Sequence, residues 1–449
     1  MPSAVAASPS PPAPAVVDRL EAFLAELIAG LEPAAGAAGR NRGRPPILPA
    51  TVLWAGLAVC VLRRATSQLD VWRLLSANGL WDFPAIPVSD DAVYKRLEQD
   101  GAAAMERLFA DVSALLAVRL DAHADRTLAP FAAEVFAIDE TALDPVARRL
   151  PALRGVPPGD DRLLPGKVAG VFDIRRQLWR GVTHVAAPRQ NEKVAARDAV
   201  ASLPPGSLLL FDLGYFAFAW FDDLTDAGRH WVSRLREKTS YVPIHVFYAD
   251  GETLDALVWL GAHRADRAKH AARLVQFRRG ATLHRYLTNV RDPHRLPLAE
   301  IARLYARRWD IEMAVDLAKT ELGLHLLWSA KPPVILAQVW AVLLIAQVVQ
   351  ALRVLVAAAA GVAPFGVSLP LLVRYLPQYA RRGHDPIAAF VADGARLGFI
   401  RPSRRTVTIA PVIPPDALHP PPPDLVLLRS PRYAQKGCGP RPRSTSHLH

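Results

Sequence analysis

Cysteine is scarce in this sequence, and its scarcity excludes two kinds of stabilising centre. Only Cys60 and Cys438 occur among 449 residues, and they lie far apart in the chain. Disulfide frameworks and structural zinc sites need several such residues at short spacings. Cys60 falls in an apolar segment typical of a buried helix, and no charged-then-apolar signal peptide opens the chain. The sequence therefore indicates a protein of a reducing compartment, the cytoplasm.

Acidic residues are also in deficit. The chain has 42 Asp and Glu against 54 Lys and Arg, which gives a formal net charge of +12. This surplus favours a polyanionic partner, because Lys and Arg neutralise phosphates in non-specific nucleic-acid binding. Arginine, alanine and proline are abundant in the way that a GC-rich genome produces. Charge alone therefore leaves nucleic-acid binding and compositional bias as equal explanations.

One long stretch, Val334 to Leu352, almost lacks polar side chains. It is long enough to span a bilayer, since a transmembrane helix needs about 20 mainly apolar residues. Three amides interrupt it, however, at Gln338, Gln347 and Gln350. Such amides are costly in lipid, so we interpret the stretch as a buried core helix. No membrane partner is expected.

The richest pattern in the chain is a stripe of polar side chains at helical spacing. Four residues follow one another at steps of three, four and seven: Tyr305, Arg308, Glu312 and Lys319. At about 3.6 residues per turn, these steps place all four on one face of a helix. One carboxylate, two cations and a phenol make an odd stripe for a core. They suit a phosphate and a metal ion.

Two aspartates upstream complete a set of three carboxylates. Asp139 ends the apolar run Glu-Val-Phe-Ala-Ile-Asp139, and Asp212 ends the run Leu-Leu-Leu-Phe-Asp212. Short apolar runs of this kind are typical of buried strands, so both aspartates are expected at strand ends. Two strand-end aspartates and the helical Glu312 can hold a pair of divalent cations.

These motifs, in this order, resemble the DDE transposases of bacterial insertion sequences, in the group named for its Y-R-E-K signature (the IS-four family). Ile-Asp139-Glu-Thr is similar to the family's first acidic stretch, and Phe-Asp212-Leu-Gly-Tyr-Phe to its second. The polar stripe keeps the family's Y-x2-R-x3-E-x6-K spacing. The resemblance covers roughly residues 130–350. Asp173 also ends an apolar run, but it ranks behind Asp212 because the Gly-Tyr-Phe of the family's second motif does not follow it.

The resemblance implies a two-metal site for phosphodiester chemistry. Two ions can activate the nucleophile and stabilise the leaving oxygen, and Mg²⁺ prefers carboxylate oxygens. Asp139 would bridge both ions, with Asp212 on one and Glu312 on the other; Mn²⁺ could take the place of Mg²⁺. The other members of the stripe would hold DNA phosphate beside the cleavage site: Tyr305, Arg308 and Lys319.

The chain departs from the family at one position. Family members that form a DNA hairpin stack a Trp, from the strand before the signature helix, on a flipped base. That register falls here near His284, in Leu-His284-Arg-Tyr286-Leu-Thr. Extruding a base costs a few kcal/mol and needs a stacking partner. His284 is therefore a candidate DNA contact, with Tyr286 or Trp259 as substitutes.

Alternating strand and helix patterns predict an α/β domain with a mixed sheet over residues 128–360. Strand-like runs at Tyr241 to Tyr248 and Thr253 to Trp259 are expected in a β insertion, 238–282, and Leu298 to Leu322 is expected to contain the signature helix. The resemblance implies a ribonuclease-H-like core. The predicted strands are Glu134 to Asp139, Lys167 to Ile174, Leu178 to Val185, Ser207 to Asp212, His230 to Leu235 and Thr282 to Val290.

The N-terminal region, 1–48, is predicted to be disordered linker sequence with one helix, Val17 to Leu31. Within it, Arg42-Gly-Arg44-Pro45 resembles the core of an AT-hook, whose extended backbone lets arginine enter a narrow minor groove. Arg42 and Arg44 are therefore candidate DNA contacts, and a plain linker is the alternative reading.

An all-helical domain is predicted at 49–127. Ser89 is a good N-cap for a helix over Asp90 to Gln99, with acidic residues in its first turn. A helix, a turn and this capped helix could enter a major groove with Lys95 and Arg96. We favour recognition of a DNA end, and a small bundle that only packs or dimerises is the alternative. Beyond the α/β domain, a C-terminal helical segment is expected at 361–400 and a disordered basic tail at 401–449.

The residues and the resemblance together predict a cut-and-paste DNA transposase. It would cleave the ends of an insertion sequence and join them to target DNA. The expected partners are double-stranded DNA, as terminal inverted repeats and target, and a second copy of the chain, because transposition must couple two ends. A cytoplasmic, nucleoid-associated location follows. The alternative is a catalytically inactive or domesticated sequence-specific DNA-binding protein, although the intact acid set argues against it.

Overall fold

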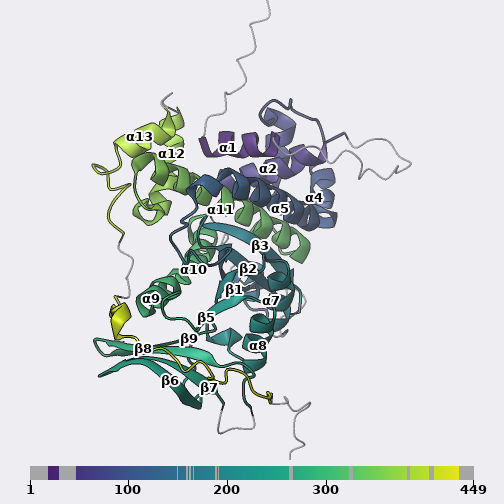
Figure 1. Cartoon of the computed structure of the whole chain (residues 1–449). Helices are drawn as coiled ribbons and strands as arrows, with labels where there is room; N and C mark the ends of the chain where they lie inside the picture. Colours follow the sequence, from purple (N-terminus) through teal and green to yellow (C-terminus); the bar gives the residue numbers. More distant parts are fainter. Residues whose placement is uncertain are drawn as a thin grey trace, which may run out of the picture. The chain divides into compact units, whose positions relative to one another are not determined.

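The computed structural model describes three stretches of the chain: 19–29, 47–403 and 409–433 (Figure 1). Short gaps within them fall at 149, 158–159, 161–162, 165, 188–189, 191, 262–265, 323–326 and 382–384. Arg42 and Arg44, the candidate minor-groove contacts, lie outside the described residues.

Contacts group the chain into two compact units. The first unit combines residues 1–128, 134–203 and 307–407, and the second combines 129–133, 204–306 and 408–449. The helices before residue 128 share a core with segments after residue 307. The units therefore cut across the predicted boundaries at residues 128 and 360.

The N-terminal helices of the first unit form close to where the sequence predicts them. The Ser89 hydroxyl accepts a hydrogen bond from the Ala92 backbone N–H at 3.2 Å, which satisfies one of the orphan donors of the first turn. A π turn at Leu74–Asn78 directly follows the short helix that ends at Arg73. The helices are α1 (Arg19–Ala29), α2 (Ala50–Leu62), α3 (Leu69–Arg73), α4 (Asp90–Gln99) and α5 (Gly101–Arg119).

The long apolar stretch is a core helix, as predicted. α11 (Pro332–Ala360) has the length and composition of a membrane span, but 89% of its most apolar window is buried inside the protein. It packs against α2, α5 and β3 (Leu178–Val185) (Figure 1). Gln347 accepts a hydrogen bond from the Trp179 backbone N–H at 2.9 Å and donates to the Trp179 carbonyl at 2.9 Å. Its amide is thus satisfied within the core, as buried polar groups generally are. Two further helices, α12 (Leu369–Arg381) and α13 (Pro386–Ala392), pack against α11.

Three antiparallel strands of the first unit carry the first acidic motif. β1 (Val135–Ala142) pairs with β2 (Lys167–Asp173), and β2 pairs with β3. The apolar run predicts a strand end at Asp139, and this prediction is wrong by three residues. The ladder continues to Ala142, so Asp139 lies within the strand, opposite Gly170.

The strands of the second unit follow the order β4-β5-β9-β8-β7-β6. β4 and β5 are parallel, and the other pairs are antiparallel. Both pairing types are present, so the predicted α/β class with mixed pairing is confirmed. The elements are β4 (Leu208–Leu210), α8 (Phe218–Asp226), β5 (His230–Arg234), β6 (Tyr241–Asp250), β7 (Thr253–Leu260), β8 (Ala272–Arg279), β9 (Thr282–Thr288) and α9 (Leu298–Arg307).

β8 is a strand that the sequence pattern does not predict. Its second residue is Arg273, a charge directly before the apolar pair Leu274 and Val275. In the structure, Arg273 is buried and forms two hydrogen bonds with Asp255 of β7, at 2.7 and 2.6 Å. A buried charge is tolerated only with such a partner, and the partner lies 18 residues away in the sequence.

The C-terminal segment differs from the predicted disordered tail. Residues 409–433 are described, and part of this segment bonds to a loop of the second unit. Arg432 and Arg267 exchange backbone hydrogen bonds, and the Ala271 N–H donates to the Leu427 carbonyl at 2.9 Å. The Arg429 guanidinium lies 4.7 Å from the Trp259 ring centroid. The prediction of disorder is wrong for residues 409–433. It relies on composition, and composition does not reveal the backbone hydrogen bonds that hold this segment. Residues 434–449 lie outside the described part.

Candidate active site

The polar stripe does not lie on one continuous helix. α9 ends at Arg307, α10 (Trp309–Asp316) begins after Arg308, and a π turn follows at Leu317–Glu321. A π turn widens the helix by one residue, so it changes the register that helical spacing assumes for Lys319. Tyr305 belongs to the second unit, and the other three members of the stripe belong to the first.

A buried carboxylate holds the first turn of α10 in place. Asp310 accepts hydrogen bonds from Arg307 at 2.7 Å and from Gln177 at 2.8 Å. Arg307 also donates to the Ile174 carbonyl at 3.0 Å, and its guanidinium lies 4.7 Å from the Phe365 ring centroid. Arg307 is thus anchored in the first unit. The sequence offers no signal for this clamp, because Gln177 lies in a turn 133 residues away.

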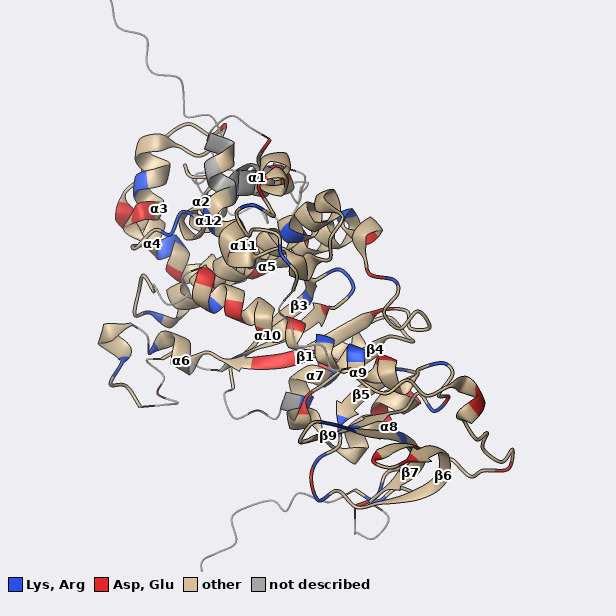
Figure 2. Ribbon diagram, turned by 90° about the vertical axis from the view of Figure 1, so that its left-hand side faces the viewer, with Lys and Arg blue, Asp and Glu red and all other residues tan. Residues whose placement is uncertain are grey.

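Glu312 forms an ion pair with Arg308, one helical turn earlier. The Arg308 guanidinium nitrogen lies 2.6 Å from the Glu312 carboxylate, and the two side chains are 9% and 33% exposed, respectively. α10 packs against β1 and β2, and Figure 2 shows acidic residues in red on both β1 and α10. The first unit therefore brings the element that carries Glu312 against the strand that carries Asp139.

Asp139 lines a small cavity together with Lys319. The cavity has a volume of about 40 Å³ and includes Gly170 and Trp179 among its lining residues. The Asp139 carboxylate accepts a hydrogen bond from the Glu140 N–H at 2.8 Å. A Cβ at Gly170 would meet the Trp179 ring at 2.5 Å, so glycine is required where this ring crosses β2 opposite Asp139. The structure thus joins two of the predicted site residues, Asp139 and Lys319, at one cavity.

Glu140 has a partner of its own. Its carboxylate lies 2.7 Å from the Lys167 ammonium group, and Lys167 also donates to the Gln190 carbonyl at 3.0 Å. Both side chains of the ion pair are largely buried. Glu140 is therefore held in a structural pair with Lys167.

Asp212 begins a tight turn in the second unit. It follows β4, and its carboxylate accepts a hydrogen bond from the Gly214 N–H at 2.8 Å. Arg236 holds the same turn, because it donates to the Leu213 carbonyl at 3.0 Å and its guanidinium lies 5.0 Å from the Phe216 ring centroid. Sequence reasoning missed Arg236, whose only signal is its position just beyond β5.

The three carboxylates are divided between the units: Asp139 and Glu312 in the first, and Asp212 in the second. Among the described residues, no group of three or more His, Cys, Asp or Glu side chains is arranged as a metal site. The donor chemistry nevertheless fits Mg²⁺, since each of the three predicted ligands is a carboxylate and none is a thiol or imidazole.

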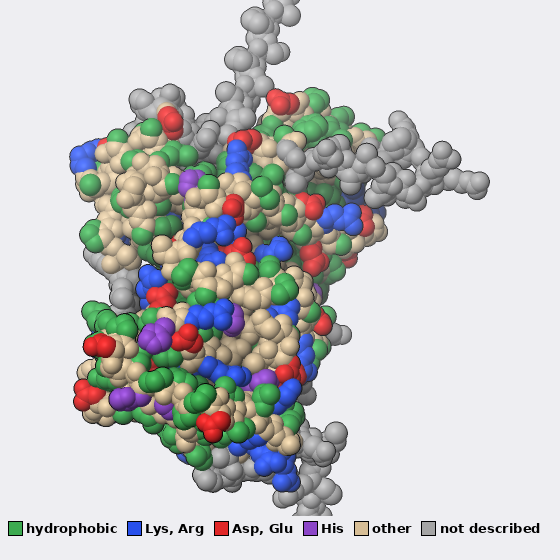
Figure 3. Space-filling model, in the orientation of Figure 1, with side chains coloured by type: hydrophobic (Ala, Val, Ile, Leu, Met, Phe, Trp, Pro, Cys, Tyr) green, Lys and Arg blue, Asp and Glu red, His purple; other side chains and the backbone are tan. Residues whose placement is uncertain are grey.

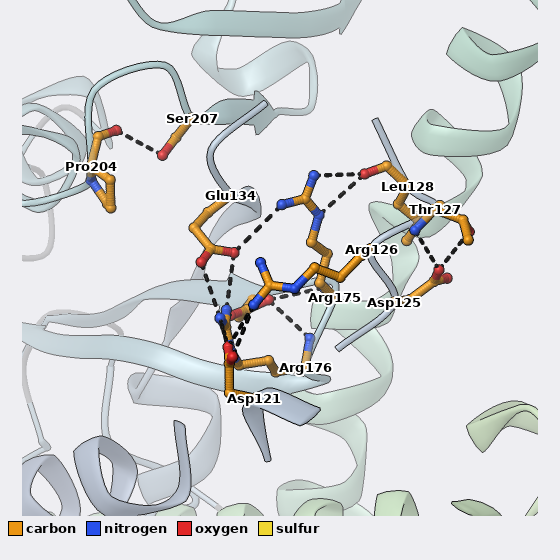
Figure 4. A network of polar contacts seen from close by, with 11 residues as sticks. Asp121, Asp125, Arg126, Thr127, Leu128, Glu134, Arg175, Arg176, Pro204 and Ser207 are labelled. Atoms are coloured by element: carbon orange, nitrogen blue, oxygen red, sulfur yellow. Dashed lines mark hydrogen bonds and ion pairs between the residues drawn. The ribbon is translucent and has the colours of Figure 1, made fainter. Parts of the chain in front are cut away.

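The decoy aspartate, Asp173, belongs to a structural network in the first unit; Figure 4 shows the side chains of Arg176, Glu134 and Asp121 from this network. Its carboxylate accepts a hydrogen bond from the Arg176 guanidinium at 2.7 Å, and Arg176 also donates to Glu134 at 3.0 Å. Asp121 bonds to the same guanidinium. Neighbouring Arg175 donates to the Leu128 carbonyl at 2.8 Å. Asp173 therefore ties the turn after β2 to the segments before β1, as its low rank in the sequence implies.

His284 lies on β9 within a row of rings. It stacks on Phe277 with ring centroids 5.1 Å apart and an interplanar angle of 15°. Its ring also hydrogen-bonds to the Tyr286 hydroxyl at 3.2 Å, and Tyr286 lies 4.9 Å from Tyr305. Burial lowers the pKa of His284, and the positive charges of Arg234 and Arg279 lower it further. Both effects favour the neutral form of the ring beside these two exposed cations.

The two candidate DNA contacts of α4 have partners within the protein. Lys95 forms an ion pair with Asp91 at 2.7 Å, and both side chains are exposed. Arg96 donates to the Leu48 carbonyl at 2.7 Å, and its guanidinium lies 5.8 Å from the Trp54 ring centroid. On the face drawn in Figure 3, basic side chains are interspersed with acidic ones. Arg96 thus has a packing role, whereas Lys95 remains accessible on the surface.

A larger cavity of the first unit borders Glu312. Its volume is about 580 Å³, and its lining includes Trp309, Met313, Arg353 and Arg401. The residues Trp309 and Met313 are 57% and 41% exposed, respectively. Neither residue stands out in the sequence, because the helical spacing of apolar residues on α10 does not mark them as site positions.

Comparison with known families gives a match over the middle of the chain. Residues 167–347 match the family model described as "Transposase DDE domain". This range includes Asp212 and Glu312, and Asp139 precedes it.

Two individual proteins are also similar to this chain. The transposase InsG of insertion sequence element IS4, from Escherichia coli (strain K12), is 29% identical over 167 residues, which are 35% of this chain and 37% of InsG. The alignment therefore spans just over a third of this relative. A cryo-EM structure of piggyBac transposase, in a synaptic complex with hairpin DNA, has 11% sequence identity and a TM-score of 0.39, covering 88% of this chain and 83% of that chain.

Proposed function

Because the chain belongs to the IS4-family DDE transposases, we propose that it cleaves DNA at the ends of an insertion sequence and transfers the freed strands to target DNA. The observation that carries this proposal is the packing of α10 against β1 within the first unit. These two elements hold Glu312 and Asp139, at the positions where the family's motifs place the third and first acids.

We propose that Asp139, Asp212 and Glu312 hold two divalent ions, Mg²⁺ or Mn²⁺. Such ions supply an activated water and stabilise the leaving oxygen of a phosphodiester. The protein would supply carboxylate oxygens from side chains whose backbone positions are fixed by hydrogen bonds. The backbone bond from Glu140 and the turn held by Arg236 limit the rotamers of Asp139 and Asp212.

A ribonuclease-H-like core is part of the same proposal. Antiparallel β3-β2-β1 in the first unit, and the parallel pair β4–β5 joined through α8 in the second, support it. We propose further that Arg308 and Lys319 bind DNA phosphate, since both lie in the unit that carries Glu312 and Lys319 shares a cavity with Asp139. Tyr305 is proposed for the same role from its place in the signature.

DNA recognition by the N-terminal region remains a proposal for Lys95, Arg42 and Arg44. Arg96 is a weaker candidate, because its guanidinium is engaged with Leu48 and Trp54. A protomer pair that joins two DNA ends is also proposed; sedimentation of the protein–DNA complex tests it, and a complex with a single protomer would contradict it. The alternative function is DNA binding without catalysis.

The function is tested by metal removal. A plasmid that carries the gene with its native flanks is incubated with the purified protein in Mg²⁺. We expect cuts at the ends of the element, their loss in EDTA, and their return when Mn²⁺ is added in excess. Cutting that persists in EDTA would contradict the metal-dependent reaction. Binding of the flanks without cutting would favour the alternative function.

Replacement of His284 with Ala tests the hairpin step. We propose that His284 stacks on an extruded base, so the variant is expected to lose about tenfold or more in hairpin yield, since one stacked base is worth about 1–3 kcal/mol. Gel analysis of the cleaved ends measures this. Tyr286→Phe is the matched control, because it keeps the neighbouring ring and removes only the hydroxyl that bonds to His284. An unchanged yield in His284→Ala removes this residue from the mechanism.

A further inference from the structure

The closest charge to the Glu312 carboxylate among its described ion pairs is the Arg308 guanidinium, 2.6 Å away. The signature spacing itself creates this pair, since an Arg and a Glu four residues apart face each other across one helical turn. The Arg308 side chain is only 9% exposed, and its guanidinium lies 5.8 Å from the Trp309 ring centroid. The Arg308 side chain is therefore more buried than that of Arg303, which pairs with Glu300 on α9 and is 48% exposed.

This pairing opposes metal binding at Glu312. A carboxylate that ligates a divalent ion donates its oxygen lone pairs, and here one oxygen already accepts from a cation. The positive charge of Arg308 beside this carboxylate also repels an incoming metal ion. Glu312 can thus offer both of its carboxylate oxygens to a metal ion only after Arg308 has moved to another anion.

We propose that Arg308 is a gate that makes metal binding at Glu312 depend on DNA. A phosphate of the DNA end takes the guanidinium from Glu312 and leaves the carboxylate free for the ion. Phosphate is a suitable competitor, because guanidinium binds it through two parallel hydrogen bonds. The inference rests on the proposed function, and it adds a second role to a residue proposed there only as a phosphate ligand.

The gate has a physical use. A nuclease site that holds its metals without DNA can cut or hydrolyse indiscriminately, whereas a gated site assembles only on a bound substrate. Thermodynamic linkage makes the effect reciprocal: if phosphate binding raises metal affinity by some factor, metal binding raises DNA affinity by the same factor. A typical coupling factor is about 5- to 150-fold.

A rival role for Arg308 predicts the opposite result. If Arg308 only holds Glu312 in the rotamer that ligates the ion, its removal weakens metal binding with or without DNA. If Arg308 is a gate, its removal strengthens metal binding in the DNA-free protein. The sign of one measured change therefore separates the two roles.

The experiment measures binding of Mn²⁺ alone to the full-length, DNA-free protein by electron paramagnetic resonance. The variants are Arg308→Gln and Arg308→Lys; the lysine keeps the charge and the buried stem if the glutamine variant is unstable. Arg303→Gln is the matched control, because Arg303 lies on α9, is exposed, and pairs with Glu300 at 2.7 Å rather than with Glu312. Asp139→Asn identifies the signal of the candidate site.

We expect Arg308→Gln to bind Mn²⁺ about tenfold more tightly than the wild type, with Arg308→Lys between them and Arg303→Gln unchanged. Adding a duplex from the gene's flank is expected to tighten Mn²⁺ binding in the wild type and to have little effect in Arg308→Gln. Equal or weaker Mn²⁺ binding in the DNA-free Arg308→Gln protein overturns the gate and leaves the proposed function intact. If no protein shows Mn²⁺ binding that Asp139→Asn removes, even with DNA, the proposed function and the gate both fail.

Discussion

Glu312→Gln is expected to lower DNA cleavage by about a thousandfold or more. A carboxylate ligand contributes to transition-state charge stabilisation worth several kcal/mol, and each 1.36 kcal/mol is a factor of ten in rate. The amide of Gln has the same shape but carries no charge, so it is a poor ligand for Mg²⁺. Cleavage of the flanking-DNA plasmid, measured as product formed per unit time, tests the prediction.

The fold should survive this substitution. Gln and Glu have similar helix propensities, and Glu312 is partly exposed, with one ion pair to lose. DNA binding should be retained, because the change frees Arg308 for phosphate. A wild-type circular dichroism spectrum together with normal DNA binding would assign the loss to the chemical step.

Asp316→Asn provides the matched control. Asp316 is an exposed acid at the end of the same helix, borders the same 580 Å³ cavity, and hydrogen-bonds to Thr320 at 2.8 Å. It receives the same carboxylate-to-amide change but lies outside the predicted ligand set. Equal cutting by the wild type and Glu312→Gln would indicate a contaminating nuclease or a misplaced site.

Asp255→Ala is expected to destabilise the second unit by about 3–5 kcal/mol, because removal of one partner leaves a buried charge without compensation. Asp255 and Arg273 are 1% and 0% exposed, and two hydrogen bonds of 2.7 and 2.6 Å join them. Arg273 also donates to the Leu296 carbonyl at 2.6 Å. The lost pair would therefore disturb the loop that leads into α9 as well as the β7–β8 ladder.

Hydrogen exchange of the β7 and β8 backbone, followed against urea concentration, reports on this unit directly. The control is Glu252→Ala, which breaks the exposed ion pair between the turn that precedes β7 and Arg278 of β8. Exposed pairs contribute little, so its effect should be near zero. The double variant Asp255→Leu, Arg273→Met should recover most of the loss, since a buried pair and an apolar replacement have similar stability. A loss in Asp255→Ala no greater than in Glu252→Ala would contradict the prediction.

Several features of this protein can be predicted from the sequence because their causes are local. The cap at Ser89 needs only a hydroxyl three residues before a free N–H. The burial of α11 follows from amides that lipid would not tolerate. The resemblance to a transposase family rests on three motifs whose spacing does not depend on the surrounding fold, and the ranking of Asp173 behind Asp212 follows from the same motifs.

Other features depend on partners that are distant in the sequence, and only the tertiary structure decides them. β1 continues past Asp139 because β2 offers it hydrogen bonds, and β8 forms between β7 and β9, where Asp255 neutralises the buried Arg273. The C-terminal segment is ordered because a loop more than a hundred residues earlier supplies its backbone partners.

The candidate site shows the same division. Motif spacing determines which residues could ligate a metal or bind phosphate, and it sets Arg308 and Glu312 one helical turn apart. It cannot show that the helix breaks at Arg308 or that Gln177 donates a hydrogen bond to Asp310. Nor can it show that Arg308 forms an ion pair with Glu312. Those outcomes depend on which surrounding groups can satisfy each buried charge, and that choice is made only when the elements pack.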